Sequence, residues 1–421
     1  MNYKRIWIFS ELYYPEDSAT GHNITRVAEG VAQRFKVEVV CSQPTYLARG
    51  TKAKTTEIRH NVRIHRCFGT TLDKNILPFR LMNLLTISIS IFLKAVISLR
   101  RDDIVLAVTN PPTLPFLVEL ACRLHGSGFL IRIEDVYPDA ITAAGIARPR
   151  SMWIRLLHDL QLRLYRRASR IIVLGRDMQD LIRGRTSGGD TRVTFISNFA
   201  DLEQIRPLQR RGNPLLKRLS LDAKFVVQYS GNMGRTHDIK SIVKAAEILH
   251  ENPYIHFLFI GWGAKEPWLR ETQEKLRLRN VTILPPQPRS DLCLSLNACD
   301  VALITFMRGM YGVSVPCRMY NNLAAGKPLI VVADPNAEVS RLVLEENLGW
   351  TVSPEMPARL AEAIVDASTH PDRMRAMALH ARRTVEEQYS EEQVVSRYIS
   401  LFRDLGVIEQ GADREKNEHA I

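Results

Sequence analysis

The sequence predicts an α/β protein built from two doubly wound, Rossmann-like units, each a parallel sheet covered by helices. Three observations support this prediction. Continuous apolar segments alternate with longer segments in which apolar residues recur at helical spacing. A segment containing proline and glycine at residues 201–220 interrupts the alternation, which then resumes. The length of 421 residues is sufficient for two or three compact units with separate cores.

Continuous apolar segments in the first half predict buried strands, because helices cover both faces of a parallel sheet. The first unit is expected to occupy residues 1–200. Its strands are expected at residues 5–10, 37–42, 104–109, 129–134 and 171–175. Its helices are expected to include residues 23–34, 113–124 and 153–167, where apolar positions recur at helical spacing.

Residues 201–222 are expected to form a linker, and the second unit is expected at residues 223–388. A last helix is predicted at residues 389–406, and the polar tail at 407–421 is expected to be disordered. The strands of the second unit are expected at residues 225–230, 256–261, 281–284, 301–305 and 329–333.

The composition excludes several classes of protein. With 45% hydrophobic and 24% charged residues, the chain is neither disordered nor fibrous. A net charge of +12 favours nucleic acid, an anionic membrane surface or phosphorylated substrates as partners. Nucleic acid is disfavoured, because the basic run at residues 148–185 offers only Trp153 and Tyr165 for stacking.

The six cysteines predict neither a metal site nor a disulfide framework. None forms a Cys-x-x-Cys pair, and no histidine lies at zinc-like spacing from a cysteine pair. The apolar neighbours of Cys41, Cys122 and Cys293 predict buried thiols. The amino terminus continues directly into a strand without an apolar signal segment, which predicts a cytoplasmic protein.

Doubly wound sheets bind ligands beyond the carboxyl ends of their strands, and two such units that face each other form a cleft. Gly231 and Gly234 follow the first strand of the second unit, together with Arg235 and His237. Glycines permit close approach of the backbone to a ligand, and the two basic side chains suit an anion. The alternative is an ordinary turn between strand and helix, and the same alternative holds for Gly261 and Gly263.

A loop at residues 311–317 leads into a short helix that ends at Gly326. Arg318 at its start could bind a diphosphate, and Asn321 one turn later could bind sugar hydroxyls. The alternative is a capped helix with a solvated arginine. In the first unit, Asp135 and Asp139 follow a strand; they either orient an acceptor hydroxyl or cap the next helix.

Taken together, these loops and their neighbouring segments resemble glycosyltransferase family 4 of the GT-B fold, in particular its WbuB-like branch. The resemblance extends over about residues 4–405. The motifs that carry it are Glu-Asp-Val-Tyr-Pro-Asp at 134–139, Arg-Ile-Ile-Val-Leu at 170–174, Ile-Ser-Asn-Phe at 196–199, Tyr-Ser-Gly-Asn-Met-Gly at 229–234, Phe-Ile-Gly-Trp-Gly at 259–263, Leu-Pro-Pro-Gln at 284–287 and Leu-Ala-Ala-Gly-Lys-Pro at 323–328.

The resemblance implies a retaining transfer of a sugar, such as an amino-deoxyhexose, from a nucleoside diphosphate-sugar. It favours a UDP-linked donor and a lipid-linked, polyprenyl-diphosphate or glycan acceptor in surface-polysaccharide biosynthesis. It also implies a last helix that returns to the first unit and a reaction without metal or other cofactor, in which the diphosphate leaves with growing negative charge. The implied catalytic residues are Asp135, Arg235 and Arg318; the implied donor-binding residues are Gly231, Asn232, Gly234, His237, Gly261, Gly263, Gln287, Ser314, Val315 and Asn321; the implied acceptor side includes Gly21 and Asp139.

The sequence departs from the family pattern at two places. The glutamate pair of the family falls on Val313 and Asn321, and a neutral amide in place of the second glutamate weakens donor binding by about 1–2 kcal/mol. The Arg-Lys pair that many members carry falls on Asn232 and His237. We expect Arg235 and Arg318 to replace that pair.

Residues 81–99 form a predicted helix with a single formal charge, Lys94, and a polar stripe at four-residue spacing. A wide apolar face flanked by arginines suits a helix lying in the surface of an anionic membrane. The alternative is a helix buried against the first sheet. A membrane span is disfavoured, because the βα pattern continues on both sides.

Two other functions stay open at this point. An enzyme of the same fold could modify the donor itself, as a sugar-nucleotide 2-epimerase does, although a soluble substrate needs no apolar surface helix. A catalytically silent relative that binds a partner is the second alternative, because Asn321 replaces a family carboxylate.

Overall fold

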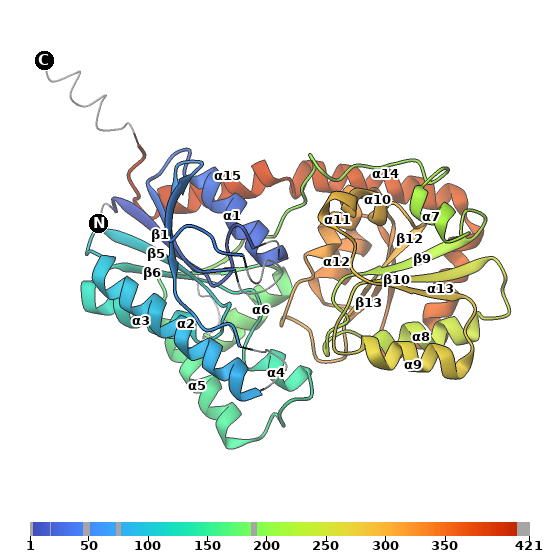
Figure 1. Cartoon of the computed structure of the whole chain (residues 1–421), viewed down its shortest axis with the longest axis horizontal. Helices are drawn as coiled ribbons and strands as arrows, with labels where there is room; N and C mark the ends of the chain where they lie inside the picture. The colour runs from blue at the N-terminus through green and yellow to red at the C-terminus, as the bar shows by residue number, and fades with distance from the viewer. Residues whose placement is uncertain (1–2, 17, 45–50, 73–76, 187–191, 411–421) are drawn as a thin grey trace, which may run out of the picture. The chain divides into compact units, whose positions relative to one another are not determined.

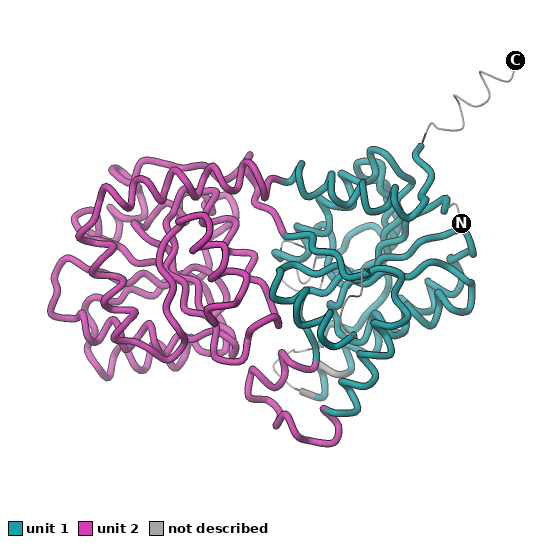
Figure 2. The backbone as a smooth tube through the Cα atoms, turned by 180° about the vertical axis from the view of Figure 1, so that it is seen from behind, with its two compact units in different colours: residues 1–137, 155–197, 391–421 teal, residues 138–154, 198–390 magenta. Residues whose placement is uncertain are grey.

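A computed structural model of the chain describes residues 3–16, 18–44, 51–72, 77–186 and 192–410. The chain forms two compact units, shown in Figures 1 and 2. The first unit comprises residues 1–137, 155–197 and 391–421, and the second comprises residues 138–154 and 198–390. Most of the tail expected to be disordered, residues 411–421, lies outside the described residues.

The first unit contains an eight-stranded sheet in the order β3-β4-β2-β1-β5-β6-β7-β8. All neighbouring strands pair in parallel except β3, which runs antiparallel to β4. The five predicted strands are confirmed, whereas the polar, alternating strands β3 and β4 and the short β8 were not predicted. The strands are β1 (Arg5–Phe9), β2 (Val37–Ser42), β3 (Thr56–Arg59), β4 (Val62–Cys67), β5 (Asp103–Val108), β6 (Gly128–Arg132), β7 (Arg170–Val173) and β8 (Val193–Phe195).

Helices cover both faces of this sheet, with α1 and α15 on one side and α2 and α3 on the other (Figure 1). The predicted helices are confirmed, with ends shifted by a few residues, as in α1. The helices of the first unit are α1 (Ala19–Val31), α2 (Leu77–Ser98), α3 (Leu114–His125), α6 (Arg176–Arg185) and α15 (Glu391–Asp404), together with most of α5 (Met152–Arg167).

The second unit contains a six-stranded, wholly parallel sheet in the order β11-β10-β9-β12-β13-β14. The strand order reverses between β9 and β12, which is the position where doubly wound sheets bind ligands. The five predicted strands are confirmed, and β14 was not predicted. The strands are β9 (Phe225–Ser230), β10 (Ile255–Ile260), β11 (Val281–Leu284), β12 (Val301–Thr305), β13 (Leu329–Val332) and β14 (Gly349–Val352).

Helices α8 and α13 pack together on one face of this sheet, and their apolar residues form its buried core with those of β9, β10 and β12. The segment expected to be a linker holds α7, which the Asn213 side chain caps at the amides of Leu215 and Leu216. The helices of the second unit are α4 (Asp139–Ala143), α7 (Pro214–Arg218), α8 (Ile239–Ile248), α9 (Glu266–Leu276), α10 (Leu292–Leu296), α11 (Arg318–Ala324), α12 (Glu338–Glu345), α13 (Pro357–Thr369) and α14 (Pro371–Gln388), with a 3₁₀ turn η1 (Arg289–Asp291).

Cys41 and Cys122 are buried, as predicted, and burial raises the pKa of the Cys41 thiol to about 12. The expectation of a buried thiol at Cys293 is wrong. That residue is only partly covered, because it lies on the short helix α10, whose neighbour Leu294 is itself exposed. The apolar residues next to Cys293 in sequence therefore do not imply that the helix is enclosed.

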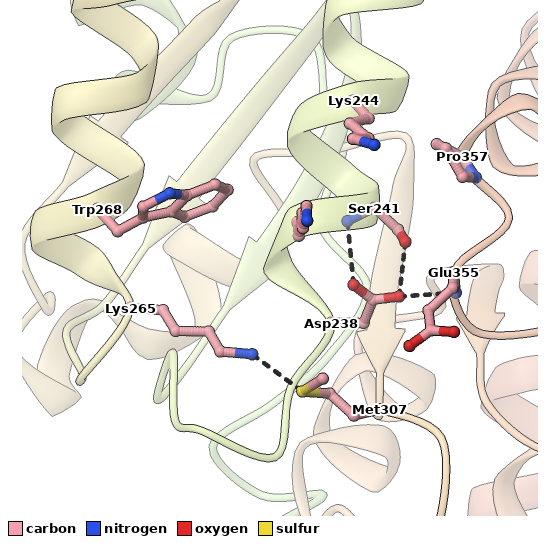
Figure 3. A pocket seen from close by; sticks show the side chains of 9 residues that line it. Asp238, Ser241, Lys244, Lys265, Trp268, Met307, Glu355 and Pro357 are labelled. Atoms are coloured by element: carbon pink, nitrogen blue, oxygen red, sulfur yellow. Dashed lines mark hydrogen bonds between the residues drawn. The ribbon is translucent and has the colours of Figure 1, made fainter. Parts of the chain in front are cut away.

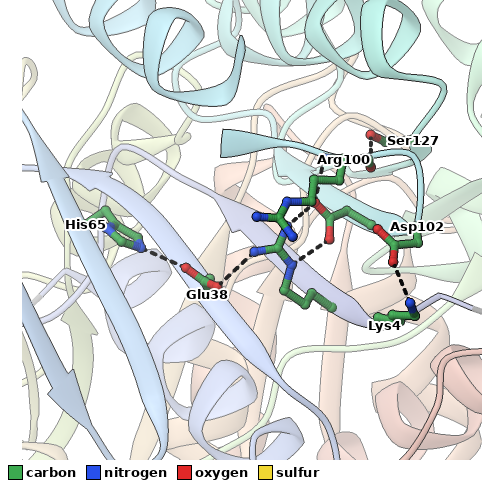
Figure 4. A network of polar contacts seen from close by, with 8 residues as sticks. Lys4, Glu38, His65, Arg100, Asp102 and Ser127 are labelled. Atoms are coloured by element: carbon green, nitrogen blue, oxygen red, sulfur yellow. Dashed lines mark hydrogen bonds and ion pairs between the residues drawn. The ribbon is translucent and has the colours of Figure 1, made fainter. Parts of the chain in front are cut away.

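Ion pairs connect four strands of the first sheet (Figure 4). Arg5 on β1 donates from Nε and Nη2 to the carboxylate of Asp103 on β5, at 2.8 Å each. Glu38 on β2 lies 3.4 Å from Nη1 of Arg5 and 2.9 Å from Nε2 of His65 on β4. Bidentate pairing of an arginine with a carboxylate fixes its geometry. The network therefore holds the register of β4, β2, β1 and β5.

The last helix returns to the first unit, as the sequence predicted. Phe402 on α15 is fully buried and meets Phe35 edge to face, with ring centroids 6.2 Å apart. Gly30 on α1 permits a close approach, because a Cβ there would lie 2.6 Å from Cγ1 of Val395. Arg26 on α1 forms an ion pair with Glu391 at 2.7 Å.

We expect Phe402→Ala to lower the free energy of unfolding of the first unit by about 3–5 kcal/mol, because it leaves a cavity between α15 and α1. Chemical denaturation followed by circular dichroism measures this loss. The matched control is Phe68→Ala, since Phe68 is 74% exposed in the same unit and its removal should cost no more than about 0.5 kcal/mol. Equal losses in the two variants would contradict the packing role of α15.

Candidate functional site

The loops that follow β9 and β10 pack directly against each other at the carboxyl end of the second sheet. The Gly231 amide donates to the Ile260 carbonyl at 2.8 Å, and the Met233 amide donates to the Trp262 carbonyl at 2.7 Å. A Cβ at Gly261 would lie 2.1 Å from the Gly231 oxygen, and Gly261 has a φ of +144°. The glycines predicted to approach a ligand are therefore required, first of all, by contact between the two loops.

Gly263, in the loop after β10, likewise permits close contact with the loop after β9. A Cβ there would lie 2.5 Å from Oδ1 of Asn232 and 2.6 Å from the carbonyl carbon of Met233. The hydroxyl of the buried Tyr229 donates to the Asn232 carbonyl at 2.8 Å, which fixes the loop from below. The backbone at Asn232 is thus held on two sides, while the Asn232 side chain itself is exposed.

Arg318, the first residue of α11, reaches this loop. Its Nη2 donates to the Asn232 carbonyl at 3.4 Å, and its guanidinium carbon lies 4.8 Å from the centroid of the Tyr229 ring. A Cβ at Gly231 would lie 3.2 Å from Cζ of Arg318, so glycine leaves room for the guanidinium. Nη1 of Arg318 is buried and has no hydrogen-bond partner among the described residues.

His237 holds the guanidinium from the other side. Nε2 of His237 lies 3.0 Å from Nη2 of Arg318, and Nδ1 lies 2.7 Å from the carbonyl oxygen of Thr305. Because a carbonyl only accepts, Nδ1 carries the proton and Nε2 accepts a hydrogen bond from Arg318. His237 therefore acts as a neutral acceptor that orients Arg318.

The surroundings of His237 favour this neutral form. Burial and the charge of Arg318 lower the pKa of His237 to about 3. The ring stacks on Phe306, with centroids 5.4 Å apart. Lys265 approaches from behind the loop, and its Nζ donates to the His237 carbonyl at 2.6 Å. Tyr229 was identified only as part of the motif at 229–234, without a role of its own. Thr305 and Lys265 were not predicted, because a backbone acceptor and a lysine that precedes a helix belong to no motif.

The other predicted donor residues surround this cluster on separate elements. Asn321 lies one helical turn after Arg318 on α11 and is partly exposed. Ser314 is partly exposed and Val315 is buried in the loop before α11. Gln287 follows β11, and its amide donates to the Pro285 carbonyl at 2.8 Å. Asn321 is therefore placed to share a ligand with Arg318.

Arg235 and Gly234 also lie on the loop after β9. The Arg235 side chain is exposed, and its charge contributes to lowering the pKa of Lys265, after the larger effect of burial. The His237 amide donates to the Gly234 carbonyl at 3.2 Å, which closes the turn. The structure thus brings Arg318 and His237 into contact and leaves Arg235 on the outer side of the loop.

The predicted acceptor residues lie on other elements. Gly21 is near the start of α1, where its amide donates to Oγ of Ser18 at 3.1 Å. Asp135 follows β6 in the first unit, beside Glu134, whose pKa is raised chiefly by burial. Asp139 belongs to the second unit as the first residue of α4.

Neither Asp135 nor Asp139 is the N-cap residue of α4. The residue at the cap of α4 is Pro138, which makes no side-chain hydrogen bond to the helix. Asp139 already lies inside the first turn, and Asp135 precedes the helix by four positions.

We expect the stability of the second unit to fall as pH falls below about 6.5, because the unfolded chain protonates His237 while the folded pKa of about 3 prevents this. At about pH 5 the loss from this residue is about 2 kcal/mol. His237→Gln should remove that loss, since an amide serves as donor and acceptor without titrating. Urea unfolding at neutral pH and at about pH 5 tests this; an unchanged pH dependence in the variant would contradict it.

Comparisons with known proteins show what this chain is similar to. The family described as glycosyl transferases group 1 matches residues 217–384. This range includes Arg318 and the residues around it, Tyr229, Asn232, His237 and Thr305, which we call the Arg318 cluster. Over 306 residues the chain is 31% identical to the probable glycosyltransferase WbjE of Pseudomonas aeruginosa, covering 73% of this chain and 76% of that protein. It is 22% identical over 413 residues to the putative colanic acid biosynthesis glycosyl transferase WcaI of Escherichia coli strain K12, covering 95% and 100% of the two chains.

Solved structures share the fold. Sucrose-phosphate synthase from Thermosynechococcus elongatus superposes with a TM-score of 0.77 at 15% identity, covering 96% of this chain and 99% of that chain. Anabaena Alr3699/HepE in complex with UDP-glucose superposes with a TM-score of 0.70 at 13% identity, covering 95% and 99%. The predicted GT-B fold with two Rossmann-like domains is confirmed. Since the identity with WbjE extends over more than two thirds of both chains, this protein belongs to the glycosyl transferases group 1 family.

Proposed function

We propose that this glycosyltransferase moves a sugar from a nucleoside diphosphate-sugar, with UDP as the nucleotide, to an acceptor in surface-polysaccharide biosynthesis. The observation that carries the proposal is the oriented, uncompensated charge of Arg318. No described carboxylate pairs with Arg318, and its buried Nη1 has no hydrogen-bond partner. A partly buried guanidinium with one unsatisfied nitrogen and no carboxylate beside it favours an anionic ligand, and a diphosphate supplies several acceptors.

The chemistry of the transfer places this cation where charge develops. As the bond from the sugar to the diphosphate breaks, negative charge grows on the leaving phosphate. A guanidinium that His237 already orients stabilises that charge without reorganising during the reaction. We therefore assign Arg318 to the leaving phosphate and His237 to its positioning, in a reaction that needs no metal ion.

Several side chains complete the proposed donor site. Asn321 suits the ribose or sugar hydroxyls, because it lies one turn after Arg318 on α11. Gly231, Gly234, Gly261 and Gly263 shape the loops under the phosphates. Arg235 is kept as a second cation on the same loop. The remaining proposed donor residues are Asn232, Gln287, Ser314 and Val315.

Retention of configuration is proposed from the resemblance to family 4. The departing phosphate would help to deprotonate the acceptor on the face from which it leaves. Asp135, with Gly21 and Asp139 on the acceptor side, would orient the acceptor hydroxyl. The resemblance to the WbuB-like branch favours an amino-deoxyhexose as the sugar.

The relatives support the donor and the pathway. HepE was solved with UDP and with UDP-glucose, and WcaI is described as a colanic acid biosynthesis enzyme. We therefore propose surface polysaccharide, such as O-antigen or lipopolysaccharide, as the product. The unsatisfied Nη1 of Arg318 also argues against a degenerate site, because a site that binds no ligand gains nothing from a buried donor without an acceptor.

We further propose that α2 docks the protein on an anionic membrane, where a lipid-linked acceptor resides. In the described part of the chain, no helix combines the length and hydrophobicity that a membrane crossing requires. Helix α2 is instead divided lengthwise. Ile87, Ile91 and Ala95 are buried on the side packed against the first unit. The opposite side exposes five large apolar residues, Met82, Leu85, Ile89, Leu93 and Ile97.

This exposed apolar face continues on a neighbouring helix and has a basic margin. Helix α3 packs beside α2 and adds the exposed Leu120 and Leu124. Arg100 and Arg101 follow the end of α2 and are exposed. The polar stripe predicted along α2 lies at its border, where Thr86 lies 2.9 Å from the Thr70 hydroxyl. The sequence alternative of a fully buried helix therefore holds for one side of α2 only, and the apolar face disfavours an enzyme that acts only on soluble sugar nucleotides.

We expect Arg318→Ala to weaken UDP binding by about tenfold to a hundredfold, since it removes charge-assisted hydrogen bonds worth about 1.5–3 kcal/mol. Thermal-shift titration with UDP and without added metal measures the loss. The matched control, Arg279→Ala, removes an exposed arginine of the same unit and should bind UDP as the wild type does. Wild-type affinity in Arg318→Ala would remove Arg318 from the phosphate site, and stabilisation by another nucleotide instead of UDP would correct the base.

We expect Ile89→Ser combined with Leu93→Ser to reduce binding to phosphatidylglycerol-containing vesicles by about tenfold or more, because each substitution removes at least about 1.5 kcal/mol of apolar burial. Co-sedimentation with and without phosphatidylglycerol measures binding. Leu344→Ser combined with Leu379→Ser is the matched control, since those residues are 60% and 73% exposed in the second unit. Equal binding by all variants would contradict the docking role of α2.

A further inference from the structure

A cavity of about 500 Å³ lies behind the loop that carries His237 (Figure 3). Its walls come from the starts of α8 and α9 and from the segments after β12 and β14. This volume falls within the range of about 300–1,000 Å³ that is typical of small-molecule sites. The cavity belongs entirely to the second unit, and none of its lining residues is among the proposed donor residues.

The two carboxylates that line this cavity, Asp238 and Glu355, interact with groups other than its lysines. Asp238 is 3% exposed, and its oxygens accept hydrogen bonds from the amide and hydroxyl of Ser241 at 3.0 and 2.6 Å. The Glu355 amide also donates to Asp238, at 3.0 Å (Figure 3). The Glu355 carboxylate lies 3.4 Å from Nε of Arg308. Neither carboxylate forms an ion pair with a lysine of the cavity in the described part of the chain, and the three lysines outnumber the two carboxylates.

Three lysines line the same cavity. Lys240 and Lys244 are exposed on α8, four residues apart, and neither has an ion-pair partner within the described residues. Lys265 precedes α9 and is partly buried, and burial lowers its pKa. Trp268, one turn into α9, is 37% exposed and presents an indole to the cavity (Figure 3). Three lysine side chains thus line one cavity together with an aromatic ring.

We propose that this cavity is a second binding site, which takes a phosphorylated ring compound, either a sugar phosphate or a nucleoside phosphate. Its phosphate would bind Lys240, Lys244 and Lys265, and its ring would lie against Trp268. Ammonium groups bind phosphate as point charges, and an indole offers an apolar face to a sugar or a base. The excess of lysines over carboxylates favours a phosphate, and the Trp268 indole favours a ring attached to it.

The site is connected to the loop of the Arg318 cluster through one lysine. Nζ of Lys265 donates to the His237 carbonyl at 2.6 Å and lies 3.2 Å from the sulfur of Met307. A phosphate bound in the cavity competes with that carbonyl for the Lys265 ammonium. His237 in turn orients Arg318, so occupancy of the cavity changes the affinity for the donor. This coupling rests on the proposed donor site, whereas the cavity does not.

The test is calorimetric titration of glucose 6-phosphate and of AMP into the full-length protein saturated with UDP, with inorganic phosphate as the bare anion. We expect one of the two ring compounds to bind with one site per chain and more tightly than inorganic phosphate. The tighter of the two identifies the source of the ligand. Equal binding of all three anions, or displacement of the probe by UDP, would overturn the proposal.

Variants locate the site. Lys240→Ala combined with Lys244→Ala should weaken the probe by about tenfold or more, with UDP binding retained. Lys217→Ala combined with Lys275→Ala removes the same charge from exposed positions of the same unit and should leave the probe unaffected. Trp268→Ala should lower the preference for the ring compounds over phosphate. Equal probe binding in both double variants would overturn the assignment.

The coupling has a separate readout. In the wild type, the probe should change the dissociation constant of UDP. Lys265→Met should bind the probe more weakly, and at probe concentrations that saturate this variant the change should be absent. A change that persists in Lys265→Met would overturn the route through His237. Failure of UDP to bind the wild type at all would contradict the proposed donor site, and titration of the probe without UDP would still test the cavity.

Discussion

The hydrogen bond between Arg318 and His237 is the contact on which the second unit's site depends. It exists only if the imidazole is neutral, because a protonated ring would place two cations 3.0 Å apart. The fold secures the neutral form in two ways. It buries the ring, and it places the Thr305 carbonyl so that the single proton stays on Nδ1. The guanidinium is thus aimed by a side chain that carries no charge, and its own charge is left for a ligand.

The loops around this contact are held by their backbones. Gly231 and Gly261 touch so closely that no side chain fits at Gly261, and hydrogen bonds between the loops after β9 and β10 hold them in register. Backbone contacts of this kind are insensitive to side-chain rotamers, so the surface formed by the two loops has little freedom. Lys265 extends the same constraint to the opposite side of the loop, where the cavity with Trp268 lies.

Helix α2 shows how one element serves both the core and an outer surface. One side supplies Ile87 and Ile91 to the core of the first unit, so the helix stays folded against its sheet. The other side leaves Leu85, Ile89 and Leu93 in a row. Such a row costs free energy in water and is stabilised when another apolar phase covers it. Because α2 has apolar residues on both its buried side and its exposed side, its sequence shows only a narrow polar stripe.

Much of the fold could be predicted from local patterns. Buried parallel strands and their covering helices leave continuous apolar runs and helical periodicity, which is why ten strands were found in advance, whereas the return of α15 was implied by the family resemblance. Four strands were missed, β3, β4, β8 and β14. β3, β8 and β14 are short strands at sheet edges, and β4 alternates apolar with polar residues instead of forming a continuous apolar run. Arg318 and His237 were recognised as basic residues after strands, but their partnership was not, since 81 positions separate them. The sequence alone was therefore sufficient for the element order and for the loops where chemistry should lie. Only tertiary structure could decide the protonation of His237, the aim of Arg318 and the exposure of α2, because burial and distance between residues far apart in the chain determine all three.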